Sequence, residues 1–325
     1  MSSHLRFGIL GCGRITRRGL IPGIQQSRGA KLTALASLRP GVAAQLASEC
    51  GNPRAHDSYE SVLADPNVDA VYIPTTGEEH HRWTLAAARA GKHVLCEKSL
   101  ALTVAESEEM IAVCREHNVL LQEAFMWRHH PRSLRARELL NRGDIGPLRL
   151  ICVHFSFDID RTDWRLDPRR GGGAVWDIGC YGVNAARYFT RAEPTTLHAR
   201  AAFNAAGADL TMQIALAFPG DVFANIDCSF NAPFRCEVEL VGERGTLTLP
   251  NTFLPPPEAK LLVRRDTAPE ASVQTLNFDS ANQYAEMVDS FCASVAAGTL
   301  QDPAENGLAN MRVLEQALHQ ARAAR

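Results

Sequence analysis

Long apolar runs, a marked net charge and paired cysteines are all missing from this sequence, and lysine is scarce. No uncharged apolar stretch approaches the roughly 18 residues that a membrane-spanning helix needs, so we expect no membrane partner. The formal net charge of -2 over 325 residues is too small to attract nucleic acid or an anionic lipid surface. These absences leave small-molecule chemistry as the favoured class of function.

The nine cysteines are odd in number, form no Cys-x-x-Cys pair and lie mostly within apolar runs between Cys12 and Cys292. Such a distribution is typical of buried thiols in a reducing compartment. The first six residues lead directly into an apolar strand without the features of a signal peptide. We therefore expect a cytoplasmic protein, and we expect no metal centre.

Apolar residues make up 46% of the chain, and its length is enough for two domains. In residues 1–124, short apolar strands alternate with amphipathic helical segments. This alternation predicts an α/β domain with a doubly wound parallel sheet, the Rossmann architecture that binds dinucleotides. The predicted strands are Leu5–Leu10, Lys31–Ser37, Asp69–Ile73, His93–Cys96 and Val119–Gln122. Thr103 and Glu106 form a possible capping box for the helix between the last two strands.

Residues 125–325 have a different pattern, which predicts an α+β domain with a mainly antiparallel open sheet. A helix over Pro131–Arg142 precedes a long strand over Leu148–Phe157. Later strand-like runs are Thr196–Phe203, Asp209–Phe218, Val222–Phe230 and Glu237–Leu249. Two helices, Asn282–Ala297 and Pro303–Ala324, close the chain and could pack on either domain. A sheet with one uncovered face favours a homodimer or a higher homo-oligomer.

The end of the first predicted strand indicates a cofactor site. The run Gly11-Cys12-Gly13-Arg14-Ile15-Thr16 joins this strand to a helix, so its glycines fall where the backbone must approach a pyrophosphate at a helix N-terminus. Thr16 stands where a third Gly or Ala is usual. The alternative is a tight turn without a ligand, and the strand before and the alternation after favour the dinucleotide site.

The end of the second predicted strand distinguishes NAD from NADP, because an acidic residue there hydrogen-bonds the ribose 2′-hydroxyl of NAD. This sequence has no carboxylate at that position and offers Ser37 and Arg39 instead. An arginine can hold a 2′-phosphate through charge-assisted hydrogen bonds. The sequence therefore predicts NADP, with NAD still possible; a solvated Arg39 at a helix start is the competing interpretation.

Lys98 follows the predicted strand His93–Cys96 and so reaches the carboxyl edge of the sheet, where open α/β sheets bind their ligands. Only four of the 34 basic residues are lysines. A lysine at this edge is therefore less easily explained as an ordinary solvated surface residue. An ammonium group there can hydrogen-bond a reacting oxygen and lower the pKa of a neighbouring acid. A loop lysine paired with Glu97 is the alternative.

At this point the sequence resembles the glucose-fructose oxidoreductase / inositol dehydrogenase (Gfo/Idh/MocA) family of two-domain NAD(P)-dependent enzymes. The resemblance rests on the glycine loop, on Ile73-Pro74-Thr75-Thr76 followed by His80, and on the run Ala90-Gly-Lys-His-Val-Leu-Cys-Glu-Lys98. Ser99 stands where the family usually has Pro. The cofactor residues implied are Gly11, Cys12, Gly13, Arg14, Ile15, Ser37, Arg39, Pro74, Thr75, His80, Glu97 and Lys98.

A second signature, Gly171-Gly-Gly-Ala-Val-Trp-Asp177-Ile-Gly-Cys-Tyr181, is similar to a glycine-rich turn and helix of the same family, with Tyr in place of His. Asp177 and Tyr181 are four residues apart, so on a helix they share one face. The resemblance implies that Lys98, Asp177 and Tyr181 form the catalytic group. A Tyr at this position is similar to the pattern of the branch that contains dimeric dihydrodiol dehydrogenase and NADP-dependent D-xylose dehydrogenase.

Four residues are expected at the substrate: Arg128 and His129 lie just past the last predicted strand of the parallel sheet, and Arg161 and Trp164 precede the glycine-rich turn. Helix-start or surface-loop roles are equally compatible with their positions. The sequence thus predicts hydride transfer between NADP(H) and a carbinol or carbonyl carbon of a sugar or cyclic polyol, of the aldose 1-dehydrogenase or trans-1,2-dihydrodiol dehydrogenase type. The alternatives are a sugar–sugar oxidoreductase with tightly bound NADP(H) and a non-catalytic NADP-sensing regulator.

Overall fold

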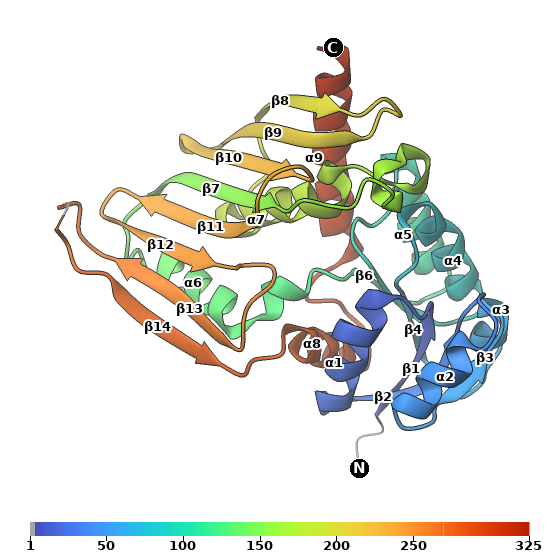
Figure 1. Ribbon diagram of the computed structural model, residues 1–325. Coiled ribbons are helices and arrows are strands. Elements are labelled where there is room, and N and C mark those ends of the chain that lie inside the picture. The colour runs from blue at the N-terminus through green and yellow to red at the C-terminus, as the bar shows by residue number, and fades with distance from the viewer. Residues whose placement is uncertain (1–3, 269, 325) are drawn as a thin grey trace. The chain divides into compact units, whose positions relative to one another are not determined.

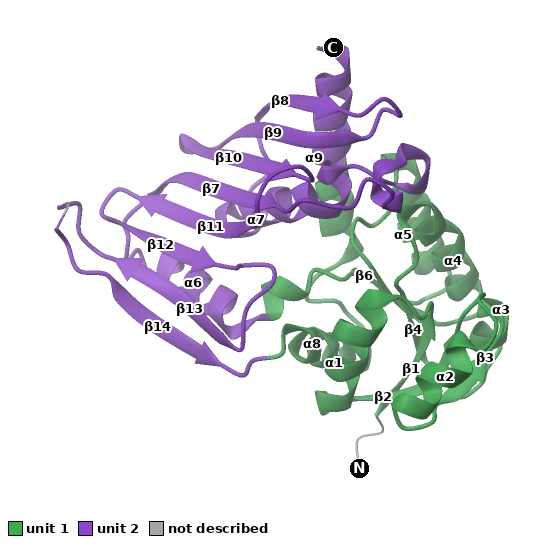
Figure 2. Cartoon of the chain, viewed as in Figure 1, with its two compact units in different colours: residues 1–129, 282–311 green, residues 130–281, 312–325 purple. Residues whose placement is uncertain are grey.

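The computed structural model describes residues 4–268 and 270–324. The chain divides into two compact units, coloured separately in Figure 2. Unit 1 comprises residues 1–129 and 282–311, and unit 2 comprises residues 130–281 and 312–325. Residues 125–129 and 282–311 therefore group with the amino-terminal unit in this division.

Unit 1 contains a six-stranded sheet in the order β3-β2-β1-β4-β5-β6, in which every neighbouring pair is parallel. The strands are β1 (Leu5–Leu10), β2 (Ala30–Ala36), β3 (Arg54–His56), β4 (Ala70–Ile73), β5 (His93–Cys96) and β6 (Leu121–Glu123). The strand order reverses direction between β1 and β4, and open α/β sheets bind ligands at such a switch point. The predicted doubly wound parallel sheet is confirmed.

The helices of unit 1 lie against this sheet, with α4 beside α5 and α1 beside α8 (Figure 1). They are η1 (Thr16–Leu20), α1 (Ile21–Gln26), α2 (Val42–Glu49), α3 (Tyr59–Leu63), α4 (Gly77–Arg89), α5 (Val104–Glu116), η2 (Met126–His129) and α8 (Gln283–Ala297). All four residues of β4 are buried, as expected for a parallel strand covered on both faces. The capping box of Thr103 and Glu106 is confirmed at the start of α5.

Unit 2 contains an eight-stranded sheet in the order β14-β13-β12-β11-β7-β10-β9-β8. Its strands are β7 (Leu148–Ser156), β8 (Thr196–Phe203), β9 (Asp209–Phe218), β10 (Val222–Ser229), β11 (Arg235–Gly242), β12 (Gly245–Pro250), β13 (Glu258–Arg264) and β14 (Gln274–Asp279). The β7–β10 pair is parallel, and the other neighbouring pairs are antiparallel. The predicted α+β domain with a mainly antiparallel sheet is confirmed.

One face of this sheet packs against helices, as Figure 1 shows for α6 and α7. The helical segments of unit 2 are α6 (Pro131–Asn141), η3 (Trp164–Leu166), η4 (Pro168–Arg170), η5 (Val175–Gly179), α7 (Cys180–Thr190) and, from residue 312 onward, α9 (Ala304–Ala323). Burial alternates along β7: Ile151 and Val153 are fully buried, whereas the adjacent residues Leu150 and Cys152 are half-buried. The alternation shows that β7 turns one set of side chains to the core and the other set to the opposite face.

Five strands differ from the sequence-based prediction, two because they were merged into one and three because they were not predicted. The run Glu237–Leu249 is two strands, β11 and β12, joined by a tight hairpin in which Gly242 pairs with Gly245. Glu243 and Arg244 at the tip of this hairpin are not among the usual turn residues, so no break between the two strands was predicted there. The short edge strand β3 and the hairpin partners β13 and β14 were not predicted.

Candidate active site

The loop after β1 has the geometry of a phosphate-binding turn. Gly11 adopts a φ of +137°, which L side chains rarely adopt. The Thr16 hydroxyl donates a hydrogen bond of 2.7 Å to the Gly11 carbonyl, so Thr16 closes the loop from the position of the usual third glycine. A Cβ placed on Gly13 would meet no atom within 4 Å. The loop therefore presents open backbone at a helix N-terminus, which suits a pyrophosphate.

The end of β2 lies beside this loop. The Cys12 thiol donates to the carbonyl of Ala36, the last residue of β2, at 3.4 Å. Ser37 is buried and accepts a hydrogen bond from the Arg39 N–H at 3.1 Å. The exposed Arg39 guanidinium reaches the Cys12 carbonyl at 3.5 Å. A guanidinium and a hydroxyl thus lie next to the loop, a donor set that fits a 2′-phosphate.

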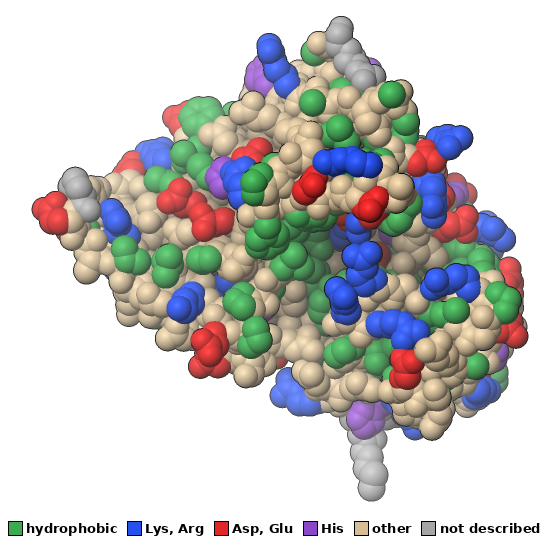
Figure 3. All heavy atoms as spheres, viewed as in Figure 1, with side chains coloured by type: hydrophobic (Ala, Val, Ile, Leu, Met, Phe, Trp, Pro, Cys, Tyr) green, Lys and Arg blue, Asp and Glu red, His purple; other side chains and the backbone are tan. Residues whose placement is uncertain are grey.

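Further basic side chains surround the same region. Figure 3 shows several Lys and Arg side chains on the part of unit 1 around η1 and α2. Arg14 is exposed at the start of the helix, and Ile15 after it is half-buried. Arg17 is paired with Glu49 at 2.6 Å. The positive charge concentrated here favours an anionic ligand.

Lys98 stands on a turn that is braced from two sides. Glu97 is buried and accepts a short hydrogen bond from the Tyr72 hydroxyl of β4. The Lys98 N–H donates to the Glu97 carboxylate at 3.3 Å, and the Lys98–Ser99 peptide bond is cis. Lys98 itself is half-buried at the carboxyl end of β5. These contacts fix the backbone from which the ammonium group projects.

His80 of α4 joins this turn to the segment Pro74–Thr75 after β4. Its imidazole is buried, with Nδ1 2.9 Å from the Ser99 carbonyl and Nε2 3.0 Å from the Thr75 carbonyl. Burial lowers the pKa of His80, although both carbonyl contacts act in the opposite direction. Both polar atoms of this ring are thus used inside the protein.

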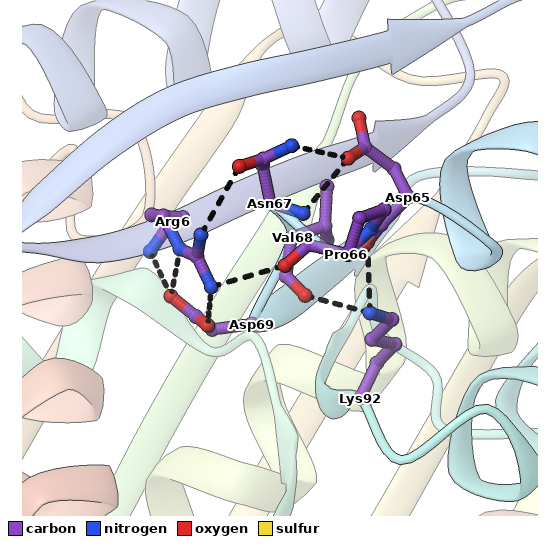
Figure 4. A network of polar contacts seen from close by, with 7 residues as sticks. All are labelled: Arg6, Asp65, Pro66, Asn67, Val68, Asp69 and Lys92. Carbon is purple, nitrogen blue, oxygen red and sulfur yellow. Dashed lines mark hydrogen bonds and ion pairs between the residues drawn. The ribbon is translucent and has the colours of Figure 1, made fainter.

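The other lysine of the same signature, Lys92, has a structural position. Its buried ammonium donates to the carbonyls of Asp65 and Val68 at 2.9 and 2.7 Å, and Arg6 pairs with Asp69 beside it (Figure 4). Lys92 precedes β5, whereas Lys98 follows it, so the two lysines lie at opposite edges of the sheet. Lys92 therefore holds the loop before β4 and does not share a site with Lys98.

In unit 2, Asp177 and Tyr181 lie on one continuous helical stretch formed by η5 and α7. Arg165 Nε lies 3.0 Å from the Asp177 carboxylate in an ion pair. The buried Tyr181 ring packs against Phe155 of β7 and Phe253, with ring centroids 5.7 and 4.8 Å apart. The two signature residues thus lie four positions apart on one helical stretch, and the tyrosine packs against aromatic rings.

The expected substrate residues have partners of their own. Arg128 is ion-paired with Asp302 at 2.8 Å, and both side chains are largely buried. Burial lowers the pKa of His129 to about 4, so this imidazole is neutral at pH 7. Arg161 is exposed and pairs with Asp158. Trp164 lies under the guanidinium of Arg165, which is 5.6 Å from the ring centroid.

Sequence reasoning missed three residues of these clusters, namely Tyr72, Phe155 and Phe253. Each contacts a signature residue that is at least 25 positions away in the chain, as Tyr72 does with Glu97. Local spacing carries no signal for such pairs. Within the described residues, no helix is long and apolar enough to span a membrane, and no cluster of three His, Cys, Asp or Glu side chains could hold a metal ion.

Comparison with known proteins gives consistent likenesses for both units. Residues 5–125 match the oxidoreductase family with an NAD-binding Rossmann fold, and residues 133–248 match the GFO/IDH/MocA C-terminal domain. The chain is 35% identical to D-xylose 1-dehydrogenase (NADP(+)) 2 of Haloferax volcanii, over 96% of this chain and 95% of the relative. It is 32% identical to dTDP-3,4-didehydro-2,6-dideoxy-alpha-D-glucose 3-reductase of Saccharopolyspora spinosa, over 98% and 96%.

Among solved structures, the chain is similar to aldose-aldose oxidoreductase from Caulobacter crescentus complexed with glycerol. The TM-score is 0.90 at 27% sequence identity, covering 99% of this chain and 98% of the other.

Proposed function

Because the chain belongs to the GFO/IDH/MocA oxidoreductase family, we propose that it transfers a hydride between NADP(H) and a carbinol or carbonyl carbon of a sugar or related cyclic polyol. The observation that carries this proposal is the carboxyl edge of the unit 1 sheet. There the glycine loop follows β1, the Ser37–Arg39 pair follows the neighbouring strand β2, and the braced Lys98 turn follows β5, which is separated from β1 by β4 alone. This edge supports dinucleotide binding next to a proton-handling side chain.

The preference for NADP is supported by the donor set beside the glycine loop. Ser37 and Arg39 offer a hydroxyl and a guanidinium, and no Asp or Glu occupies residues 36–40 to accept a hydrogen bond from a ribose 2′-hydroxyl. Arg39 is already oriented toward the loop through the Cys12 carbonyl. A relative with 35% identity is a dehydrogenase that uses NADP(+) by name.

The nicotinamide ring, when bound, accepts or returns the hydride. We assign proton transfer to Tyr181: oxidation of a carbinol releases the hydroxyl proton as the hydride leaves the carbon, and reduction needs it back. A tyrosine in water has a pKa near 10, so a proton-accepting tyrosine needs a cation beside it. Lys98 is the residue that we assign to this role, with its ammonium also donating to the reacting oxygen.

Asp177 completes the proposed catalytic group, and its ion pair with Arg165 keeps its carboxylate oriented. Trp164, Arg161, Arg128 and His129 remain the candidates for binding substrate hydroxyls. The ion pair with Asp302 holds the Arg128 guanidinium in one position, and burial keeps the His129 imidazole neutral, so both would meet substrate hydroxyls in a fixed state.

A second candidate is a sugar–sugar oxidoreductase that retains NADP(H) through both half-reactions. It is favoured by the structural similarity to an aldose-aldose oxidoreductase. Gel filtration separates the two candidates: a dehydrogenase exchanges NADP(H) on dilution, whereas a retained cofactor leaves the protein only on denaturation. A regulator that only senses NADP(H) has no need of Lys98, Asp177 and Tyr181 together.

The proposed function is tested with a panel of aldoses, cyclic polyols and trans-dihydrodiols, using NADP+ and NADPH, followed by Tyr181→Phe and Lys98→Ala on the best substrate. Each variant should lose about 10²- to 10⁴-fold in turnover, the usual range for general acid–base catalysis. The two losses should not add, because residues that act as one unit fail together. Tyr188→Phe, on the same helix, is the control and should retain activity. Near-normal turnover of Tyr181→Phe would refute the assignment.

A further inference from the structure

The helical stretch that carries Asp177 and Tyr181 has no capping side chain of its own. It is preceded by Gly171–Ala174, and Ala174 at the N-cap position supplies no side-chain hydrogen bond. The first N–H groups of any helix have no partner within the helix. In this chain the acceptor comes from elsewhere: the carboxylate of Asp209, the first residue of β9, accepts a hydrogen bond of 2.7 Å from the Val175 N–H.

We propose that Asp209 is a positioning residue for the reaction, which holds the amino end of the helical stretch η5–α7 and thereby sets the positions of Asp177 and Tyr181. The proposal rests on the function assigned above, because it concerns the same proton-transfer residues. Asp209 contacts neither of them; it acts through the backbone on which they are mounted.

The glycine-rich signature is explained by this contact. A Cβ on Gly173 would lie 2.2 Å from Asp209 Oδ1, and Gly173 has a φ of +128°. Only glycine therefore lets the carboxylate reach the turn. A Cβ on Gly172 would lie 2.5 Å from the carbonyls of Arg165 and Asp167. The missing side chain at Gly172 thus allows the turn to pack closely against the loop that contains Arg165, the ion-pair partner of Asp177.

Asp209 is buried at a cost in solvation, and the groups around it partly offset that cost. Asp209 is 1% exposed, and burying an ionised carboxylate is costly unless it is hydrogen-bonded. Burial raises its pKa to about 6, while the N–H groups of Val175 and Ala174 and the charge of Arg322 on α9 act to lower it. The Cys228 thiol on β10 faces the same carboxylate and is neutral, because burial raises its pKa well above the usual value. At neutral pH an anion therefore lies against the positive end of the helix.

The functional consequence follows from geometry. Asp177 is the third residue of η5, so fraying of this turn displaces it directly, and Tyr181 is only one turn further on. A displacement of about 1 Å in a catalytic group costs on the order of 10²-fold in rate. Cofactor binding depends on unit 1 residues, so NADP affinity should change little.

The test compares Asp209→Asn and Asp209→Ala with wild type and with Asp221→Asn, an exposed Asp in the turn between β9 and β10. Two measurements are made: hydrogen–deuterium exchange of residues 174–182, and turnover and NADP affinity on the best substrate of the panel. Asp209→Asn keeps an acceptor oxygen and should lose about tenfold in turnover, and Asp209→Ala about 100-fold. Exchange of residues 174–182 should accelerate in the same order, with NADP affinity within about twofold.

Unchanged exchange in both variants would overturn the proposal, and so would accelerated exchange with unchanged turnover. If Asp209→Ala does not fold, Asp209→Asn decides on both measurements. Failure of the assigned function looks different: wild type itself would then turn over no member of the panel, while the exchange comparison would still report whether Asp209 holds the helix.

Discussion

A fully buried arginine in unit 2 allows a stability prediction to be worked out contact by contact. Arg132, the second residue of α6, is 0% exposed. Its guanidinium donates to four backbone carbonyls, those of Pro250, Asn251, Thr252 and Lys260, at 2.6 to 3.3 Å. Burial lowers its pKa to about 10, so the group remains charged at pH 7. The arginine is thus the shared hydrogen-bond donor of the β12–β13 connection.

Arg132→Met keeps much of the side-chain volume and removes every donor. Each carbonyl left buried without a partner costs about 1 to 3 kcal/mol. With four acceptors at the low end of that range, the free energy of unfolding should fall by about 4 kcal/mol. For a unit of this size the unfolding temperature should fall by about 10 °C. Arg132→Lys should recover only part of this loss, because an ammonium cannot span the positions that a planar guanidinium reaches.

Urea unfolding followed by circular dichroism measures this change, with Arg135→Met as the control. Arg135 lies on the same helix, is partly exposed and pairs with Glu138, so its removal should cost no more than about 1 kcal/mol. If Arg132→Met unfolds within 1 kcal/mol of wild type, then the carbonyls have found other partners, and the reasoning from buried acceptors is wrong.

Three further outcomes are expected. Arg39→Ala should weaken NADP binding about 10- to 100-fold and leave NAD binding unchanged, as measured by titration of both cofactors; equal losses for both would contradict the 2′-phosphate assignment. We expect the open face of the unit 2 sheet to form a homodimer interface, since Phe223 on this face is 53% exposed beside its cross-strand partner Leu150. Phe223→Glu should therefore dissociate dimers in sedimentation, whereas the loop variant Phe234→Glu should not. The folded state binds the Asp209 proton more tightly than the unfolded state, because its pKa is raised from 3.8 to about 6. The resulting stabilisation, about 3 kcal/mol, is fully present below about pH 4 and is lost as the pH rises through 6. Asp209→Asn should remove this pH dependence from the free energy of unfolding.

The sequence predicted those parts of the fold and site that have local signals. The β1 turn, the β5 end with Lys98 and the helical spacing of Asp177 and Tyr181 each occupy a few consecutive residues, and the structure has strands, turns and helices there. The three-residue strand β3 has too few residues to show a period, and the hairpin at Glu243–Arg244 lacks turn residues. These features follow from pairing with neighbours and are invisible in local composition.

The residues that brace the site were missed for a related reason. Asp209 lies 34 positions after Val175, and Arg132 lies 118 positions before the first carbonyl that it binds. A charged residue within an otherwise ordinary segment indicates a solvated surface, and only the three-dimensional contact shows that its charge is used inside the protein. The glycines of the second signature marked the place, but not the carboxylate that requires them.

The scarcity of lysine makes this protein suited to amine-selective labelling. Of its four lysines, Lys31 and Lys260 are exposed, Lys98 is half-buried and Lys92 is buried with its ammonium bound to two carbonyls. Reductive methylation with ¹³C-formaldehyde should therefore tag Lys31 and Lys260 first and Lys92 last. The resulting NMR spectrum would contain few enough methyl signals for Lys98 to be observed directly, as a reporter whose chemical shift follows the charge of its surroundings when cofactor and substrate are added.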